Sequence, residues 1–493
     1  MFCLGYDLGS SSVKVCLLDG ASGRGVAHAS YPDREMTIEA PKPGWAEQAP
    51  ETWWECAKRA TERLLEGVDI AAPDIKAIGI SYQMHGLVLL DRDGRVIRPA
   101  IIWCDSRAVD VGVRAFEALG ESRCLEALLN APGNFTASKL AWVRENEPAH
   151  FERAHTMMLP GDYFAWRLTG RAATTVSGLS EGILWDFSKH ETAGFLLEHF
   201  AIPASLVPEV VPTFGEQGRL TEAAAKELGL KAGTPVTYRA GDQPNNALSL
   251  GVLEPGEIAA TAGTSGVIYG ISDTVRADRR SRVNSFAHVN HTTEATRLGI
   301  LLCINGTGSA YRWLRERLET DYDKMNEQAS EVPIGCDGFR FFPFGNGVER
   351  MLENRDLGAS LTHLDFNIHG DAHLARGVQE GVAFAFQYGM DVLRELGMRP
   401  AVIRAGLQNM FSSPVFREIL TSTTGVSLEL YCTDGAEGAA RGAAFGIGHY
   451  ASLSEALTGL RRDAVFEPNL ERAARYREAY RAWVDELTER MSS

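Results

Sequence analysis

Short apolar stretches that end in glycine and hydroxyl residues recur along the chain. Residues 2–7 are largely apolar and end at the turn Gly9-Ser10-Ser11-Ser12, after which residues 13–18 return as a second apolar stretch. This pattern predicts a β-hairpin with Asp7 and the serines at its tip. Strand-like residues likewise flank Gly263-Thr264-Ser265-Gly266 near the middle of the chain.

The two glycine turns indicate an internal duplication. Residues 4–13 and 258–267 each contain apolar residues, a glycine, two hydroxyl residues, a small residue and a valine, and Gly9 and Gly263 are 254 residues apart. This offset is about half the chain, so we expect two similar α/β domains. Each domain is expected to begin with a hairpin whose tip faces a shared cleft.

Further strands and helices alternate between and after these hairpins. Polar residues follow several of the apolar strands, at the position where ligands bind in α/β sheets. The pattern predicts strands at residues 75–81, 87–90, 101–103, 298–304, 339–344 and 402–404, and helices at 51–66, 138–146, 149–168, 310–318, 372–396, after Pro414, within 434–448 and at 469–491.

Two polar segments carry candidate chemistry. The acidic turn Gly241–Asn246 lies between apolar segments, and Asp242 within it is a candidate catalytic carboxylate. In the first hairpin, the hydroxyls and exposed N–H groups of Ser10–Ser12 can meet phosphate oxygens, with Lys14 adding positive charge. Both segments have a plainer interpretation, because Asp, Asn, Pro, Ser and Gly are ordinary turn formers.

Composition narrows the possible partners. The 493 residues have a net charge of −15, which argues against nucleic acid because phosphate-backbone binding needs clustered cations. No signal peptide is evident, and no apolar stretch approaches the 18 residues that a membrane span needs. The eight cysteines form no C-x-x-C pair, which favours reduced thiols in a cytoplasm. The sequence contains no P-loop motif and no dinucleotide-binding fingerprint.

Taken in order, the motifs resemble those of the FGGY carbohydrate kinases, and most closely the branch that acts on xylulose. The resemblance covers residues from about 2 to 450 and rests on Asp7-Leu8-Gly9-Ser10-Ser11, Gln83-Met84-His85-Gly86, Trp103-Cys104-Asp105-Ser106-Arg107, Ala240-Gly241-Asp242, Gly263-Thr264-Ser265-Gly266 and Ala405-Gly406. It implies two actin-like (ribonuclease H-like) ATPase domains of α/β class that flank a central cleft. The N-terminal domain would span residues 1–252 and the C-terminal domain residues 253–493.

The resemblance also implies an activity and its residues. ATP would phosphorylate D-xylulose to D-xylulose 5-phosphate in the cytoplasm, in an enzyme that is a homodimer. Asp242 would be the general base, and Asp7 and Asp242 would hold Mg²⁺ through water. The sugar would contact Gln83, Met84, His85, Trp103, Asp105 and Gln243. The nucleotide would contact Gly9, Ser10, Ser11, Lys14, Gly263, Thr264, Ser265, Gly406, Leu407 and Asn409.

Two departures from the family pattern leave alternatives open. Gln243-Pro244 follow Asp242 where the family has asparagine, and Ala405-Gly406-Leu407 stand where it has three glycines. The sugar could therefore be another ketose or a polyol, such as ribulose. A non-catalytic sugar or nucleotide sensor, or an ATPase of the actin or chaperone type, would use the same fold. The actin and chaperone ATPases lack the Gln-Met-His-Gly element.

Overall fold

Residues 1–492, which the computed structural model describes, form two units that each combine separate stretches of the chain. Unit 1 comprises Met1–Gly251, Phe286–Leu298 and Thr433–Leu460, and unit 2 comprises Val252–Ser285, Gly299–Cys432 and the chain from Arg461 on. Two later stretches thus belong to the unit that contains the N-terminus. The assignment of family-type domains to 1–252 and 253–493 stays a prediction.

Unit 1 is organised around a mixed sheet of six strands. The strand order is β13-β14-β5-β1-β2-β3. β1 pairs antiparallel with β2 and parallel with β5, and β14 also runs parallel to β5. The predicted first hairpin is therefore present. The strands are β1 (Phe2–Leu8), β2 (Val13–Asp19), β3 (Arg24–Tyr31), β5 (Ile75–Tyr82), β13 (Phe214–Arg219) and β14 (Pro235–Gly241).

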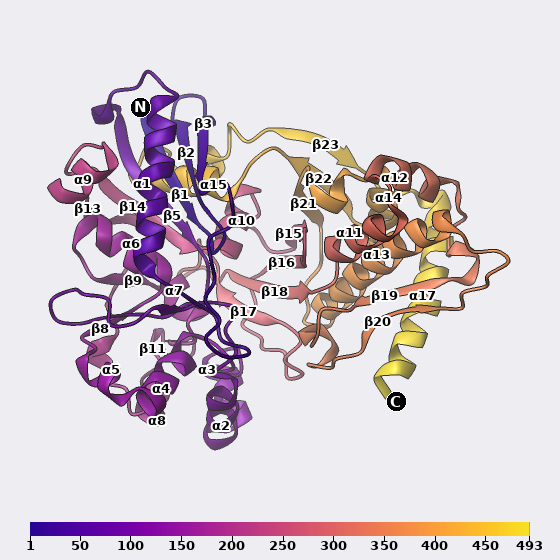
Figure 1. Ribbon diagram of the computed structural model, residues 1–493, viewed down its shortest axis with the longest axis horizontal. Helices are drawn as coiled ribbons and strands as arrows, with labels where there is room; N and C mark the ends of the chain where they lie inside the picture. Colours follow the sequence, from indigo (N-terminus) through magenta and orange to yellow (C-terminus); the bar gives the residue numbers. More distant parts are fainter. Residues whose placement is uncertain (493) are drawn as a thin grey trace. The chain divides into compact units, whose positions relative to one another are not determined.

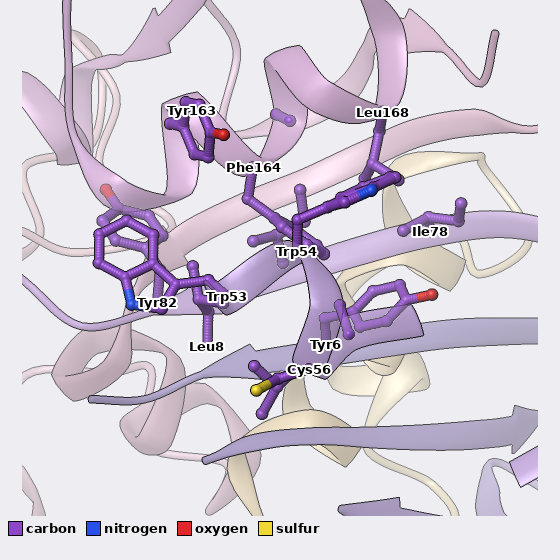
Figure 2. Close-up of a cluster of buried hydrophobic side chains, with 14 of the residues drawn as sticks. Tyr6, Leu8, Trp53, Trp54, Cys56, Ile78, Tyr82, Tyr163, Phe164 and Leu168 are labelled. Carbon is purple, nitrogen blue, oxygen red and sulfur yellow. The ribbon is translucent and has the colours of Figure 1, made fainter. Parts of the chain in front are cut away.

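Alternate residues of the strands build the core on one face of this sheet. Because successive side chains of a strand point to opposite faces, β1 contributes every second residue to this side. Helices α1 (Pro50–Glu66) and α6 (Pro160–Thr169) cover it. Figure 2 shows part of this core, which includes Tyr6, Leu8, Trp53, Trp54, Ile78, Tyr82, Tyr163, Phe164 and Leu168.

The other face of the sheet is covered by α15 (Gly435–Gly446), which lies among the strands of unit 1 in Figure 1. The approach is close because β1 and β5 present glycines on this side. A Cβ atom at Gly5 would lie 2.0 Å from the carbonyl oxygen of Ala436, and one at Gly79 would lie 2.0 Å from that of Ala439. No side chain larger than hydrogen fits at either position.

The sheet of unit 2 repeats the strand order of unit 1. Its order is β17-β18-β16-β15-β21-β22-β23, so β18-β16-β15-β21-β22 correspond to β3-β2-β1-β5-β14. β15 and β16 form the second predicted hairpin. The repeat confirms the expected α/β fold with two actin-like domains. The strands are β15 (Glu257–Ala262), β16 (Gly266–Ser272), β17 (Asn284–Ala287), β18 (Leu298–Ile304), β21 (Val402–Gly406), β22 (Ser427–Tyr431) and β23 (Arg462–Phe466).

Helices of unit 2 pack around the long helix α13 (Asp371–Glu395). The terminal helix α17 (Leu470–Ser492) buries one face. Its Trp483 is 1% exposed, stacks on Phe342 with ring centroids 5.0 Å apart and donates a hydrogen bond to the carbonyl of Phe341. The other helices of this unit are α11 (Gly308–Leu318), α12 (Tyr322–Glu331) and α14 (Pro414–Thr424).

Shorter elements complete the two units. They are β4 (Glu47–Gln48), β6 (Val88–Leu90), β7 (Ala100–Ile101), α2 (Val109–Leu119), α3 (Glu121–Ala127), α4 (Thr136–Asn146), α5 (Pro148–Arg153), β8 (Thr156–Met158), β9 (Ala173–Thr175), α7 (Val176–Glu181), β10 (Trp185–Asp186), β11 (Glu191–Thr192), α8 (Gly194–His199), β12 (Glu209–Val211), α9 (Glu222–Leu228), α10 (Asp242–Ser249), β19 (Arg340–Phe344), β20 (Gly358–Thr362) and α16 (Leu453–Ala456).

Two expectations about local structure were wrong. The helix expected over 149–168 is divided, because residues 156–158 form β8 against β6 and Pro160 then starts α6 as its first residue. The acidic turn at Gly241–Asn246 is the beginning of helix α10, with Asp242 as its first residue. Turn-forming residues at a helix start resemble a loop in the sequence, because the same side chains favour both.

Within residues 1–492, none of the eight cysteines forms a disulfide bond. Within residues 1–492, no helix is both long and apolar enough to cross a bilayer.

We predict that Gly79→Ala destabilises unit 1, because the added methyl group would overlap the backbone of α15. Overpacking of this kind costs about 1–3 kcal/mol of unfolding free energy. Chemical denaturation followed by circular dichroism measures the loss. Gly194→Ala is the matched control, since a Cβ there meets nothing within 4 Å. Equal stability of the two variants would contradict the close packing of α15.

Candidate functional site

The candidate site of unit 1 lies where three parallel strands of its sheet end. Pairing across the sheet places Ala240, Ser81, Asp7 and Lys14 side by side on β14, β5, β1 and β2. Asp242 follows Ala240 by two residues, and the Gln83-Met84-His85 segment follows Ser81. The carboxyl ends of parallel strands are where open α/β sheets bind ligands.

Asp7 points to the face of the sheet that α15 covers. Ser81 Oγ donates a hydrogen bond of 2.8 Å to Asp7 Oδ1, and Lys14 Nζ lies 3.9 Å from Oδ2. A Cβ at Gly435, the first residue of α15, would lie only 2.7 Å from Oδ2. Burial raises the pKa of Asp7, and Lys14 and Ser81 partly offset this rise.

Asp242 is a half-buried carboxylate at the beginning of helix α10. Burial, and then the negative charge of Asp7, raise its pKa to about 7. Hydrogen bonds from the backbone and side chain of Gln243 act in the opposite direction. The group therefore exchanges its proton near neutral pH, which is the property that a general base requires.

The turn after β1 is supported by its neighbours. The N–H of Gly9 donates to the carbonyl of Ser12 over 3.1 Å, and Gln48 Nε2 donates to the carbonyl of Ser10 over 2.7 Å. Trp103 Nε1 donates to Ser10 Oγ over 3.3 Å, while its ring is 53% exposed. The structure thus brings the predicted sugar residue Trp103 to the predicted phosphate turn.

The segment after β5 packs directly against the strand end that leads into Asp242. A Cβ at Gly241 would lie 2.5 Å from Cγ of Met84. Met84 is 4% exposed and Gln83 is 2% exposed, with Gln83 Nε2 donating to Gln48 Oε1 over 3.4 Å. Both side chains are therefore buried against other parts of the protein. Direct contact of either one with the sugar stays a prediction.

His85 is the polar side chain of this segment that remains partly exposed, at 17%. Its ring contacts the rings of Phe135 and Phe286, with centroids 4.9 and 5.3 Å away. Glu181 Oε2 accepts a 2.9 Å hydrogen bond from the backbone N–H of His85. Burial raises the pKa of Glu181 well above its ordinary value.

Asp105 is fully buried, and its carboxylate is hydrogen-bonded to other groups of the protein. It accepts hydrogen bonds from the backbone N–H of Ala46 over 2.6 Å and from the guanidinium of Arg107 over 2.7 Å. Arg107 also lies 3.8 Å above the ring centroid of Trp45. A role for Asp105 in sugar binding stays a prediction, and its observed contacts are structural.

Unit 2 has its own pocket, of about 430 Å³, at the carboxyl end of β15. The glycine turn after β15 is fastened to the start of α11, because the N–H of Gly308 donates to the carbonyl of Gly263 over 2.7 Å and Thr307 Oγ1 donates to it over 2.9 Å. The pocket is lined by Gly263, Thr264, Gly308, Tyr311, Arg312, Tyr322, Asp323, Asn326, Asn409, Met410, Ser412 and Ser413.

Three predicted nucleotide residues, Gly263, Thr264 and Asn409, line this pocket. Ser265, Gly406 and Leu407 are not among its lining residues, and Leu407 is 49% exposed at the end of β21.

Sequence reasoning did not assign several residues that the structure brings to these sites. In unit 1 they are Ser81, Gly435, Phe135, Phe286 and Glu181. In unit 2 they are chiefly residues of α11 and α12. The glycine turn 305–309 between a strand and a helix was a usable signal for α11, since helix N-termini that follow such turns bind anions. The role of Glu181 had no such signal, because its partner His85 is 96 residues away.

Comparison with known proteins assigns both halves of the chain to one family. The model for the FGGY family of carbohydrate kinases, N-terminal domain, matches residues 2–249, and the model for its C-terminal domain matches residues 258–449.

Curated relatives and solved structures agree with this match. Xylulose kinase of Escherichia coli (strain K12) is 32% identical over 98% of this chain and 99% of its own length. Xylulose kinase of Bacillus subtilis (strain 168) is 29% identical over 97% of this chain and 94% of its own. The crystal structure of xylulose kinase from Rhodospirillum rubrum superposes with a TM-score of 0.88 at 27% identity, covering 100% of both chains.

The paired strand orders, the carboxylates at the strand ends and these matches lead to one conclusion. The chain belongs to the FGGY family of carbohydrate kinases and is an ATP-dependent sugar kinase.

Proposed function

We propose that the protein transfers the terminal phosphoryl group of ATP to D-xylulose and releases D-xylulose 5-phosphate. The observation that carries the proposal is the half-buried Asp242 with a pKa of about 7, beside a second carboxylate at the same edge of the sheet. The choice of sugar is supported by the printed name of the Escherichia coli relative, which is 32% identical over nearly the full length.

Asp242 acts as the general base. Phosphoryl transfer depends on placing the acceptor hydroxyl in line with the phosphate and on neutralising charge. The carboxylate of Asp242 accepts the proton of the sugar hydroxyl while the hydroxyl oxygen attacks the terminal phosphorus of ATP. ADP is the leaving group. Asp242 needs no ion-pair partner for this role, because its raised pKa already makes it a competent base near neutral pH.

Asp7 and Asp242 fit a magnesium ion that is bound mainly through water. The negative charges of the two carboxylates repel each other, and a divalent cation bound between them would relieve this repulsion. Mg²⁺ prefers oxygen ligands of this kind. When bound, the ion would neutralise charge on the phosphates. Lys14, close to Asp7, and the hydroxyls of Ser10 and Ser11 supply positive charge and hydrogen-bond donors to the same phosphates.

The sugar is proposed to lie against His85 and the exposed ring of Trp103. A ketose presents several hydroxyls and one carbonyl, so hydrogen-bonding side chains beside an apolar surface suit it. Gln243, which follows the base directly, replaces a family asparagine and donates to Asp242. It is a further candidate contact with the sugar, and it is the residue through which ribulose or another ketose could be preferred.

The pocket of unit 2 is proposed to receive the nucleotide. Tyr311 and Tyr322 stack at its wall with ring centroids 5.6 Å apart, and Arg312 lies beside them. Gly263 and Thr264 supply backbone N–H groups where phosphate oxygens would lie. Ser265, Gly406 and Leu407 remain candidate contacts at the rim of the same strand ends.

We further propose a cytoplasmic homodimer. A cytoplasm supplies ATP, and eight cysteines that form no disulfide bond in the described chain suit a reducing compartment. The dimer is supported by the family resemblance alone.

The substrate is tested by ADP release with magnesium-ATP across a panel of ketopentoses, ketohexoses and polyols. We expect D-xylulose to give the highest kcat/KM, with D-ribulose as the closest competitor. A higher kcat/KM for another sugar would replace xylulose as the substrate. No sugar-dependent release with any compound would overturn the kinase proposal itself and favour a sensor.

Asp242→Asn is expected to lower kcat by about 10²–10⁴-fold, because a general base contributes this much to a proton transfer. The amide keeps the size of the side chain, so nucleotide affinity measured by calorimetry in the absence of magnesium should stay unchanged. Asp69→Asn, an exposed carboxylate in a loop, is the control for loss of one charge. Near-normal turnover in Asp242→Asn would remove Asp242 from the role of base.

The pH dependence of kcat/KM follows from the pKa of Asp242. The carboxylate form accepts the proton, so kcat/KM should rise with pH up to a midpoint near 7 and be level above it. Below the midpoint, kcat/KM should fall about tenfold for each pH unit, as expected for a single protonation. A profile that is flat from acid to neutral pH would contradict the assignment.

A further inference from the structure

A network of side-chain hydrogen bonds lies at the wall of the pocket in unit 2. It joins Ser413, Gln379, Tyr311 and Asn326, of which all but Gln379 line the pocket. Gln379 belongs to α13 and is fully buried, and Tyr311 and Ser413 are 4% and 3% exposed. Asn326, on α12, is the member that remains partly exposed. The network therefore connects buried side chains to one that reaches the pocket.

The direction of the hydrogen bonds can be followed from Ser413. Its Oγ accepts the N–H of Phe416 over 3.3 Å at the start of α14 and donates to Gln379 Oε1 over 2.6 Å. Because the oxygen of the Gln379 amide faces Ser413, its Nε2 is the donor on the other side. Nε2 lies 2.9 Å from the hydroxyl of Tyr311 and 3.3 Å from Asn326 Oδ1. The Tyr311 hydroxyl then donates its own hydrogen to Asn326 Oδ1 over 2.8 Å.

The opposite direction would leave a buried hydroxyl hydrogen without an acceptor. If the Gln379 amide were turned over, its Nε2 would donate to Ser413 Oγ, which already accepts the N–H of Phe416. The hydrogen of Ser413 would then meet no acceptor among the described residues, at a side chain that is 3% exposed. Burying a donor without a partner is unfavourable, so the network takes the first direction.

The amide of Asn326 is consequently oriented with its oxygen toward the protein. Oδ1 accepts from Tyr311 and Gln379, while Nδ2 has no hydrogen-bond partner within residues 1–492. An amide nitrogen carries two hydrogens and can only donate. Asn326 thus presents a hydrogen-bond donor of fixed orientation at the wall of the pocket.

The surroundings of Asn326 favour contact with the base of a nucleotide. The N–H groups proposed for the phosphates belong to the turn at Gly263–Thr264, which is fastened to Gly308 at the start of α11. Asn326 comes from α12, one turn after Tyr322, and Tyr311 and Tyr322 give this part of the pocket an aromatic wall. Aromatic side chains suit a flat base, and the ring nitrogens of adenine accept hydrogen bonds.

We propose that Asn326 is a specificity-determining residue for the nucleotide, whose Nδ2 donates a hydrogen bond to a ring nitrogen of adenine. The proposal rests on the proposed function in placing ATP in the pocket of unit 2. Asn326 discriminates because Tyr311 and Gln379 hold its oxygen, so the amide does not turn over to offer an acceptor. A group that can only donate is therefore disfavoured at this point. Gln379 is a positioning residue, since it acts on the nucleotide through Asn326.

The test measures binding of ADP by calorimetry without sugar, so that no phosphoryl transfer occurs. The probes are ADP and its 1-deaza, 3-deaza and 7-deaza analogues, each of which has a C–H in place of one ring nitrogen. We expect one analogue to bind the wild type about five- to tenfold more weakly than ADP, as one lost hydrogen bond requires. Asn326→Ala should bind that analogue and ADP equally, because the donor is missing.

Two further variants separate the donor from other effects. Asn326→Asp keeps the shape of the side chain and can still accept from Tyr311 and Gln379, but it has no hydrogen to donate at neutral pH. It should therefore also bind the analogue and ADP equally, and its added charge cancels in this ratio. Glu327→Ala, at an exposed neighbouring position of α12, is the matched control and should keep the wild-type ratio.

Three outcomes would overturn the proposal. They are equal binding of ADP and all three deaza analogues by the wild type, a weaker binding of one analogue that persists in Asn326→Ala, and a dependence on Asn326 of the 6-amino group instead. The last is measured with purine riboside diphosphate, which lacks this group, and would show that the amide presents its oxygen.

The same measurements separate this inference from the proposed function. ADP binding requires no sugar, so the role of Asn326 is decided even if no ketose proves to be a substrate. ADP that binds without any dependence on Asn326 would overturn this inference alone. No binding of ADP to the wild type would overturn it together with the nucleotide site proposed for unit 2.

Discussion

The close packing of α15 on the sheet of unit 1 is the contact on which the two candidate catalytic carboxylates, Asp7 and Asp242, depend. Glycines at positions 5 and 79 let the helix backbone approach β1 and β5, and Gly435 lets the first turn of the helix meet Asp7. Alternation along β1 then leaves Asp7 on the covered face, next to Ser81. Burial on this side is what raises the pKa of Asp7, and the Asp7 charge in turn helps to raise that of Asp242.

Much of this arrangement could be predicted from local sequence. The two hairpins, their duplication and the candidates Asp7 and Asp242 followed from short motifs in which apolar alternation meets a glycine turn. The helical start at Asp242 could not be predicted, because Asp, Gln, Pro and Asn favour turns and first helical turns alike. The prediction of a single helix over 149–168 failed for a related reason. β8 within it forms by pairing with β6, and the local sequence pattern does not indicate this pairing.

The remaining features depend on residues far apart in the sequence. Glu181 and His85 are 96 residues apart, and only the fold shows that one fixes the other. The pocket of unit 2 likewise joins the turn at Gly263 to residues of α11, α12 and the segment around Asn409. Sequence motifs thus predicted some residues of each site, while the other residues are brought to the sites only by the tertiary structure.

The order of the chain has a consequence for biosynthesis. The helix that covers Gly5 and Gly79 ends at Gly446 of a 493-residue chain, with most of unit 2 encoded before it. A nascent chain therefore exposes one face of its first sheet to solvent until α15 has been made, after most of unit 2. The N-terminal unit begins first and is completed late, so translation past α15 is the step that first encloses Asp7.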